Sequence, residues 1–248
     1  MTLKLMSFRP DMHRLLALAA RERLLPAGGD LGYALHAVFA ASFADRAPKP
    51  FRFLAPGDPG GGPAGRLFAY SACSLDDLRA QATAFADPAF ANVLRLEEAE
   101  AKAMPTDFPT GTRLGFSLRL RPVQRTGASP DGLEKARERD VYDGPGEGEA
   151  RGAAARAHAY AAWLERQFNR SNAATLEDWH IEALKQTRLR ARDRGAGTST
   201  PRDVSGPDAT YSGVLRVTDP EAFAALLARG IGRFRAFGFG MLLLKPPG

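Results

Sequence analysis

The stretch that decides the fold is YSGVLRVTDPEAFAALLARGIGRFRAFGFGMLLLKP, residues 211–246. Residues 211–217 alternate as a β-strand does, and Asp219 with Pro220 behind it is a typical helix start, so the run EAFAALLARG predicts a helix. The glycine-rich loop 230–240 follows, and FGMLLLKP predicts a closing apolar strand. This order of strand, helix, loop and strand predicts the second half of an α+β domain.

The first hundred residues show the same element types in the order β-α-β-β-α-β. Asp30 and Ser74 stand where helix N-caps belong, and apolar residues at helical spacing follow each of them. Strands are predicted at residues 2–8, 51–54, 66–73 and around 93–104. This order is that of a ferredoxin-like domain, a four-stranded antiparallel sheet backed by two helices, which is also the fold of RNA-recognition modules.

The second half of the chain begins with a strongly alternating segment, LGFSLRLRPV, at residues 114–123. In a strand, this alternation places Arg119 and Arg121 on one face and the apolar residues between them on the other. We therefore expect an apolar face and a basic face, and the two arginines of the basic face are candidate RNA contacts.

The remaining segments complete a second copy of the same topology. Residues 127–150 are rich in Gly, Pro, Asp and Glu and predict a loop, which the helical run AAARAHAYAAWLERQF follows. We predict an α+β fold of two tandem ferredoxin-like (RRM-like) domains, antiparallel sheets backed by helices, over residues 1–108 and 109–248.

The composition favours an anionic partner, because a formal net charge of +6 attracts nucleic acid or an acidic membrane surface. The single cysteine, Cys73, lies in a predicted strand and is expected in the core, and the four histidines lack the spacing of a zinc site. We expect no metal and no cofactor. No apolar run approaches the roughly 20 residues of a membrane span, and the N-terminus lacks a signal-like apolar region, so we expect a cytoplasmic protein without a membrane partner.

Cationic residues are concentrated in residues 185–202, where six positive charges minus one negative give +5. Four of the arginines occupy every second position, so that in an extended hairpin they point to one side, and Gly-Ala-Gly at 195–197 supplies a turn. A guanidinium group bridges phosphate oxygens or a guanine edge, which suits RNA. We predict an RNA-binding arm, with an exposed basic loop as the alternative. Its cations are Lys185, Arg188, Arg190, Arg192, Arg194 and Arg202.

The loop GIGRFRAFGFG at residues 230–240 is a second candidate for RNA binding. Glycines let backbone amides approach a phosphate closely, and the two arginines add positive charge. The alternative is a tight connection in which the glycines only provide the required φ angles. A nucleotide-binding P-loop is excluded, because no Gly-Lys-Ser/Thr follows. The candidate residues are Gly230, Gly232, Arg233, Arg235, Gly238 and Gly240.

Tyr33 and His36 form a third candidate site, because the i, i+3 spacing places phenol and imidazole on one helix face. An imidazole is suited to proton transfer near neutral pH, and a neighbouring phenol can orient the reacting groups. A histidine on a helix is more often only packed, so this alternative stays open.

Together, the short first strand, YALH at 33–36, FSLRLRPV at 116–123 and residues 211–246 resemble the CasE family of CRISPR repeat-cleaving endoribonucleases. The last stretch is the specific one. It has the strand with a Gly-Val-Leu core, the Asp-Pro helix, the Gly-Ile-Gly-Arg loop and a Phe-Gly-x-Gly-Leu-Leu-type end.

The resemblance implies two tandem ferredoxin-like domains and a metal-independent endoribonuclease. Such an enzyme binds the CRISPR repeat hairpin, cuts precursor CRISPR RNA at its base, and keeps the mature guide RNA in a Cascade complex with other subunits. Tyr33 and His36 match the family's Tyr-x-x-His pair. By this resemblance His36 acts as general acid/base in attack of a ribose 2′-hydroxyl on the adjacent phosphate, and Tyr33 positions the reacting groups.

One segment departs from the family. Residues 9–30 form an unusually long segment with an amphipathic stretch, which either shifts the register of the first strand and helix or adds a helix near the Tyr33–His36 pair.

Two alternative functions stay open. The first alternative is a non-catalytic RNA-hairpin-binding subunit. The second is a ferredoxin-like protein whose glycine-rich loop binds a phosphate ligand, which leaves the basic arm unexplained.

Overall fold

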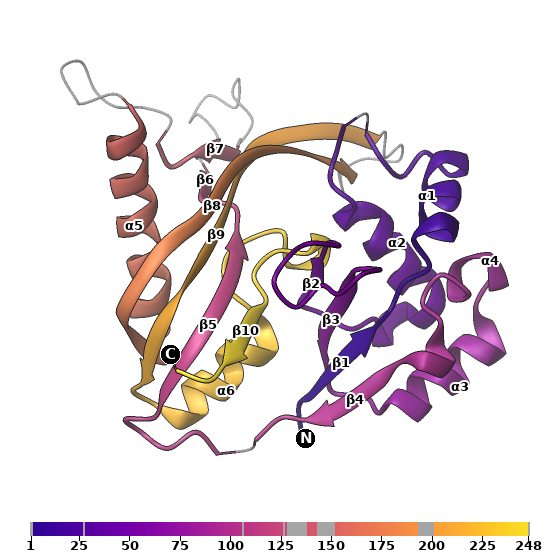
Figure 1. Cartoon of the computed structure of the whole chain (residues 1–248), viewed down its shortest axis with the longest axis horizontal. Coiled ribbons are helices and arrows are strands. Elements are labelled where there is room, and N and C mark those ends of the chain that lie inside the picture. Colours follow the sequence, from indigo (N-terminus) through magenta and orange to yellow (C-terminus); the bar gives the residue numbers. More distant parts are fainter. Residues whose placement is uncertain are drawn as a thin grey trace.

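The computed structural model describes residues 2–26, 28–105, 107–125, 127, 138–142, 152–192 and 201–247. Two four-stranded antiparallel sheets lie side by side, one built from each half of the chain (Figure 1). The predicted boundary at residues 108 and 109 falls in the connection between the two sheets and stays a prediction.

The first half is a ferredoxin-like unit with additions. Its sheet has the strand order β2-β3-β1-β4, and all its pairs are antiparallel. Helices α2 and α3 are the two helices of the ferredoxin-like fold, whereas α1 and α4 are additions. The elements are β1 (Lys4–Phe8), α1 (Met12–Arg21), α2 (Gly32–Phe43), η1 (Ala44–Arg46), β2 (Phe51–Leu54), β3 (Arg66–Ser71), α3 (Leu75–Phe85), α4 (Pro88–Ala91), η2 (Leu96–Glu98) and β4 (Glu100–Ala103).

The second half repeats the topology, because its sheet order β10-β5-β9-β8 is the same order of fourth, first, third and second main strand. The two predicted ferredoxin-like units are therefore confirmed. The elements are β5 (Arg113–Leu120), β6 (Val123–Arg125), β7 (Glu138–Asp140), α5 (Ala153–Asn169), β8 (Ala174–Arg192), β9 (Pro201–Val217), α6 (Pro220–Arg229), η3 (Arg235–Phe237) and β10 (Leu242–Lys245).

Each sheet buries one face under its own helices. In the first half, Met6 and Phe8 of β1 pack under Phe39 of α2. In the second, the predicted apolar face of β5 packs against α5 and α6, and its residues Phe116, Leu118 and Leu120 are fully buried. Tyr70 of β3 joins the two halves, since its hydroxyl donates to the Leu242 carbonyl at 2.8 Å. Burial raises the pKa of Tyr70 above its ordinary value.

Three predicted elements need correction. The fourth strand starts at Glu100 and not near residue 93, because Val93 and Leu94 are both buried in a turn that a strand's alternation excludes. Short strands β6 and β7 pair within and beside the predicted loop 127–150, whose other residues lie mostly outside those described. The predicted strand 211–217 is only the end of β9, which continues from Pro201 as half of a long hairpin.

The predicted helices are confirmed, but Asp30 is not the N-cap of α2, because Leu31, which has no capping side chain, holds that position. The stretch within residues 9–30 forms α1, whose N-cap Asp11 accepts a hydrogen bond from the Arg14 amide at 3.0 Å. Asp219 caps α6 in the same way, at 2.9 Å from the Ala222 amide. Within the described ranges, no helix has the length and apolar character needed to cross a membrane.

Candidate functional site

Helix α2 carries the predicted Tyr33–His36 pair. Leu31 is its N-cap residue, and Asp30 just before it accepts a hydrogen bond at Oδ1 from the Gly32 amide at 2.7 Å. The two rings lie one turn apart with centroids 6.2 Å from each other. Tyr33 is 8% exposed and His36 is half-buried, so the phenol belongs to the packed side of the helix and the imidazole lies at its edge.

The glycine-rich loop lies directly against this pair. Phe237, in the turn η3, has its ring centroid 5.1 Å from that of His36 and 5.9 Å from that of Tyr33. Gly32 makes this approach possible, because a Cβ there would lie only 2.1 Å from the Phe237 carbonyl oxygen. Two features predicted separately from the sequence thus meet at one place. Phe237 itself was not predicted, since only the folded chain brings it to α2.

The glycines of the loop have structural reasons for being glycine. Gly230, Gly232, Gly238 and Gly240 all adopt positive φ, between 73° and 83°. The Ile231 amide donates to the Gly240 carbonyl at 2.9 Å, and a Cβ on Gly240 would lie 2.3 Å from the Ile231 carbonyl oxygen. The loop therefore closes on itself, as expected of a tight connection whose glycines provide the required φ angles. Contact of these glycines with RNA stays a prediction.

The loop's arginines line a cavity of about 760 Å³ beside Phe237. Arg233 pairs with Glu138, and Arg235 donates to the Arg229 carbonyl at 2.8 Å. Lys49 lines the same cavity. The cavity with these basic side chains thus shares Phe237 with the Tyr33–His36 pair.

The predicted arm is a β-hairpin. Strands β8 and β9 pair without interruption from Lys185 opposite Asp208 to Arg192 opposite Pro201, and the hairpin arches over toward α1 and α2 (Figure 1). The extended pairing is therefore confirmed. Arg194 and the predicted Gly-Ala-Gly turn lie outside the described residues, and the side chains of Arg192 and Arg202 are not described.

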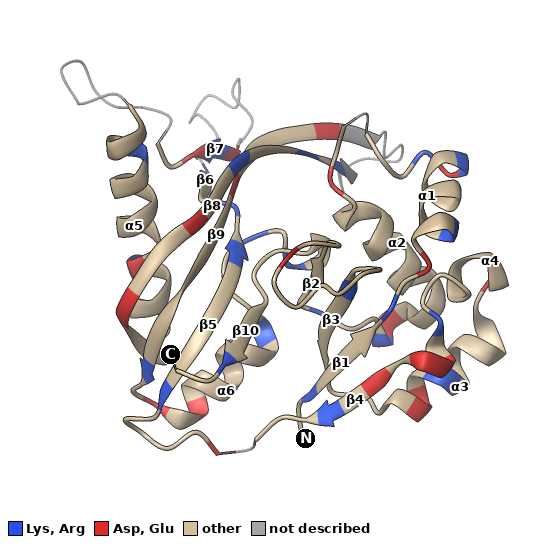
Figure 2. Ribbon diagram, in the orientation of Figure 1, with Lys and Arg blue, Asp and Glu red and all other residues tan. Residues whose placement is uncertain are grey.

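Acidic as well as basic positions occur along this hairpin (Figure 2). Arg190 Nε lies 3.1 Å from Asp203 Oδ1, and Lys185 Nζ lies 3.9 Å from Asp208 Oδ2. Arg188 is exposed. The count that gave +5 stopped at residue 202, just before Asp203 and Asp208 of β9. It therefore overstates the positive charge that the hairpin presents.

The prediction of an exposed basic face on β5 is wrong, because that face is covered. Arg119 is 9% exposed and its Nη2 lies 2.6 Å from Asp30 Oδ2 and 2.5 Å from Asp208 Oδ2. Burial lowers the pKa of Arg119, but the hydrogen bonds and charges of the two carboxylates outweigh burial and raise the pKa above its ordinary value. We do not retain Arg119 as an RNA contact.

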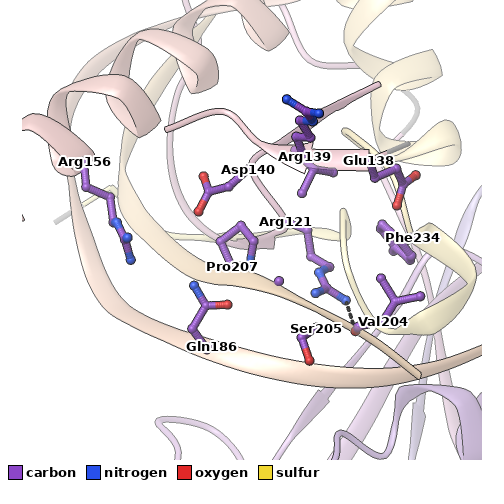
Figure 3. A pocket seen from close by; sticks show the side chains of 12 residues that line it. Arg121, Glu138, Arg139, Asp140, Arg156, Gln186, Val204, Ser205, Pro207 and Phe234 are labelled. Atoms are coloured by element: carbon purple, nitrogen blue, oxygen red, sulfur yellow. Dashed lines mark hydrogen bonds between the residues drawn. The ribbon is translucent and has the colours of Figure 1, made fainter. Parts of the chain in front are cut away.

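Arg121 is 1% exposed and is likewise no longer a candidate contact. Its guanidinium lies over the Phe234 ring at 5.0 Å, and Gly206 leaves room for it, since a Cβ there would lie 2.4 Å from Arg121 Nη2. Burial lowers the pKa of Arg121. Figure 3 shows it in a cavity of about 250 Å³ between the hairpin and β7, with Gln186 and Ser205 on the hairpin side.

A second cleft, of about 440 Å³, lies between the two halves and was not predicted. Arg52 of β2 is 6% exposed in its wall, and burial together with the charge of Arg119 lowers its pKa to about 10. The cleft carries as many acidic as basic side chains, so it is no anion-binding groove by charge alone. Its charged residues are Asp30, Arg52, Asp58, Arg119, Glu182, Lys185, Asp208 and Lys245.

Cys73 is half-buried and packs against the first core, but it lies two residues beyond β3 and not in a strand as predicted. Among the described residues, no three His, Cys, Asp or Glu side chains group as metal ligands do. The absence of a metal and of a cofactor stays a prediction.

The model of a family described as CRISPR associated protein matches residues 9–246, nearly the whole chain. The chain belongs to this family. The family predicted from the sequence motifs is thereby confirmed.

A curated relative is the CRISPR-associated endoribonuclease Cse3 of Thermus thermophilus, 29% identical over 140 residues, which are 55% of this chain and 57% of the relative. The match thus spans little more than half the length of that protein. Among solved structures, Thermus thermophilus Cse3 bound to an RNA representing a pre-cleavage complex is similar at a TM-score of 0.62, with 20% identity over 99% of this chain and all of that one. The CRISPR-associated protein Cas6e from Escherichia coli K-12 has a TM-score of 0.55, with 20% identity over 99% and 100% of the two chains. At these identities the likeness shows the fold.

Proposed function

We propose that this protein is an endoribonuclease that binds the hairpin of a CRISPR repeat and cuts precursor CRISPR RNA at its base without a metal ion. The observation that carries the proposal is the Tyr33–His36 pair held against Phe237 of the glycine-rich loop, in a member of a CRISPR-associated family. The curated relative is named an endoribonuclease, and one similar structure holds a pre-cleavage RNA.

The reaction that this site supports is an internal transesterification. The 2′-hydroxyl oxygen attacks the adjacent phosphorus, the bond from phosphorus to the 5′-oxygen breaks, and the products are a 2′,3′-cyclic phosphate and a free 5′-hydroxyl. The 2′-hydroxyl loses a proton and the 5′-oxygen gains one, and His36 exchanges a proton with these oxygens. Tyr33, fixed by packing, positions the reacting groups.

The cations beside the pair supply charge stabilisation. Lys49, Arg233 and Arg235 line the cavity that shares Phe237 with the pair, so a phosphate there meets positive charge. Exposed Arg188 on the hairpin contacts the backbone of the RNA stem. The product remains bound as guide RNA, and other Cascade subunits are the proposed protein partners.

The test is cleavage of end-labelled repeat RNA in EDTA, with a second RNA that carries a 2′-deoxy nucleotide at the cleavage position. We expect the first RNA to yield one cut with a cyclic phosphate end and the second to bind but remain whole. Binding without any cleavage of the first RNA would favour a non-catalytic subunit. Cleavage of the deoxy RNA would exclude attack by the 2′-hydroxyl.

A further inference from the structure

Asp30 connects three parts of the molecule through three separate hydrogen bonds. Its Oδ1 accepts from the Gly32 amide at the start of α2, at 2.7 Å, and its Oδ2 accepts from Arg119 of β5, at 2.6 Å. Its own amide donates to the Arg188 carbonyl of β8, at 2.9 Å. The side chain is 14% exposed, so these contacts are shielded from water and from salt.

Arg119 extends this connection into the second half of the chain. Its Nε and Nη2 form a bidentate pair with Asp208 of β9, at 2.9 and 2.5 Å. The same guanidinium lies over the Phe239 ring of the glycine-rich loop, 4.3 Å from its centroid. One arginine therefore holds Asp30, the hairpin strand β9 and the loop in fixed relation.

The segment before α2 is also attached to the hairpin. The Arg23 carbonyl accepts a hydrogen bond from the Arg190 guanidinium. A Cβ on Gly29 would lie 2.9 Å from the Arg188 carbonyl oxygen, so glycine lets the chain run close to β8. The part of the segment 9–30 that follows α1 thus lies against the hairpin at Arg23 and Gly29.

We infer that Asp30 is a positioning residue for the cleavage proposed above, on which this inference rests. It fixes the N-terminal end of α2, and with it Tyr33 and His36, relative to Arg119 and to the β8–β9 hairpin. An RNA stem bound on the hairpin then presents its scissile phosphate at a set distance from His36. Loss of the Asp30 charge leaves the hairpin and its cations in place but removes the contact that holds the start of α2 to Arg119.

The test variant is Asp30→Asn, which keeps an acceptor oxygen for Gly32 and the amide that bonds to Arg188, but removes the charge that holds Arg119. We expect the single-turnover cleavage rate at saturating RNA to fall about 10- to 100-fold, because a displacement of the catalytic groups by about 1 Å can slow a reaction by up to about 100-fold. The dissociation constant for the hairpin should be nearly unchanged. Asp30→Ser, whose hydroxyl oxygen can also accept from the Gly32 amide but carries no charge, should behave alike.

Two comparisons separate positioning from general stability. Asp11→Asn is the matched control, since Asp11 caps α1 through the Arg14 amide at 3.0 Å, and it should cleave at the wild-type rate. The double variant Asp30→Asn/Arg119→Gln should cleave no more slowly than the slower of the two single variants, because both substitutions remove the same Asp30–Arg119 contact. Wild-type rates for Asp30→Asn and Asp30→Ser, with His36→Ala inactive, would overturn the inference alone. Full activity of His36→Ala would overturn the proposed function instead.

Discussion

Gly32→Ala tests the contact between α2 and the glycine-rich loop. The new Cβ would lie 2.1 Å from the Phe237 carbonyl oxygen, and reaching even 3.0 Å, below which such contacts essentially never occur, requires the two elements to separate by about 0.9 Å. Overpacking of this kind costs about 1–3 kcal/mol. Alanine's better helix propensity returns about 1 kcal/mol, so the net loss of stability is small.

The catalytic effect should be much larger than the effect on stability. A shift near 1 Å between Phe237 and the Tyr33–His36 pair is expected to slow cleavage by up to about 100-fold. The assay is single-turnover cleavage of labelled repeat RNA at saturating protein, with thermal unfolding of the same variant measured alongside. Gly127→Ala is the control, because its Cβ would meet nothing within 4 Å. A wild-type rate for Gly32→Ala would refute the claim that the loop positions the pair.

Three further outcomes are expected. Arg188→Ala should weaken RNA binding and lower the slope of log affinity against log salt by about one. Arg190→Ala should change the slope less, because the charge of Arg190 is already paired with Asp203 on the hairpin. Equal slopes for the two variants would contradict this. Tyr33→Phe should slow cleavage less than loss of the imidazole does, because the packed ring remains; an unchanged rate would make the hydroxyl dispensable. The hydrogen bond from Arg113 holds the pKa of Glu177 below its ordinary value of 4.5, so the pair stabilises the fold above that pH and the stabilisation is lost on acidification. Glu177→Gln should therefore be less stable than wild type at pH 7, and the difference in stability should close below about pH 4.5. Urea unfolding of both proteins at the two pH values measures this difference.

The topology was predictable because each unit carries its own local signals. Caps at Ser74 and Asp219 mark helix starts, whereas Asp30 lies one residue before the N-cap position of α2; the alternation in β5 identifies its apolar face. The start of β8 was missed because register shifts at Leu176/Asp178 and Ile181/Ala183 break the alternation that defines a strand. In this polar segment, a strand without alternation has neither of the two patterns, alternation or an apolar run, by which the other strands were predicted.

The candidate site was only partly predictable. The spacing of Tyr33 and His36 places them on one helix face, which is a local property. That Phe237 packs on them, and that Asp30 covers Arg119, depends on how the two halves meet. Alternation assigns Arg119 to a face but does not say what lies over that face.

The most direct test of the account is the single-turnover rate of His36→Ala on labelled repeat RNA at saturating protein in EDTA. The control is His158→Ala on the exposed side of α5. We expect His36→Ala to bind the hairpin with near wild-type affinity and to cleave it at least about 100-fold more slowly, since general acid–base catalysis contributes about 10²–10⁴-fold. His158→Ala should cleave normally. Cleavage by His36→Ala at the wild-type rate would contradict the assignment of this helix as the catalytic element.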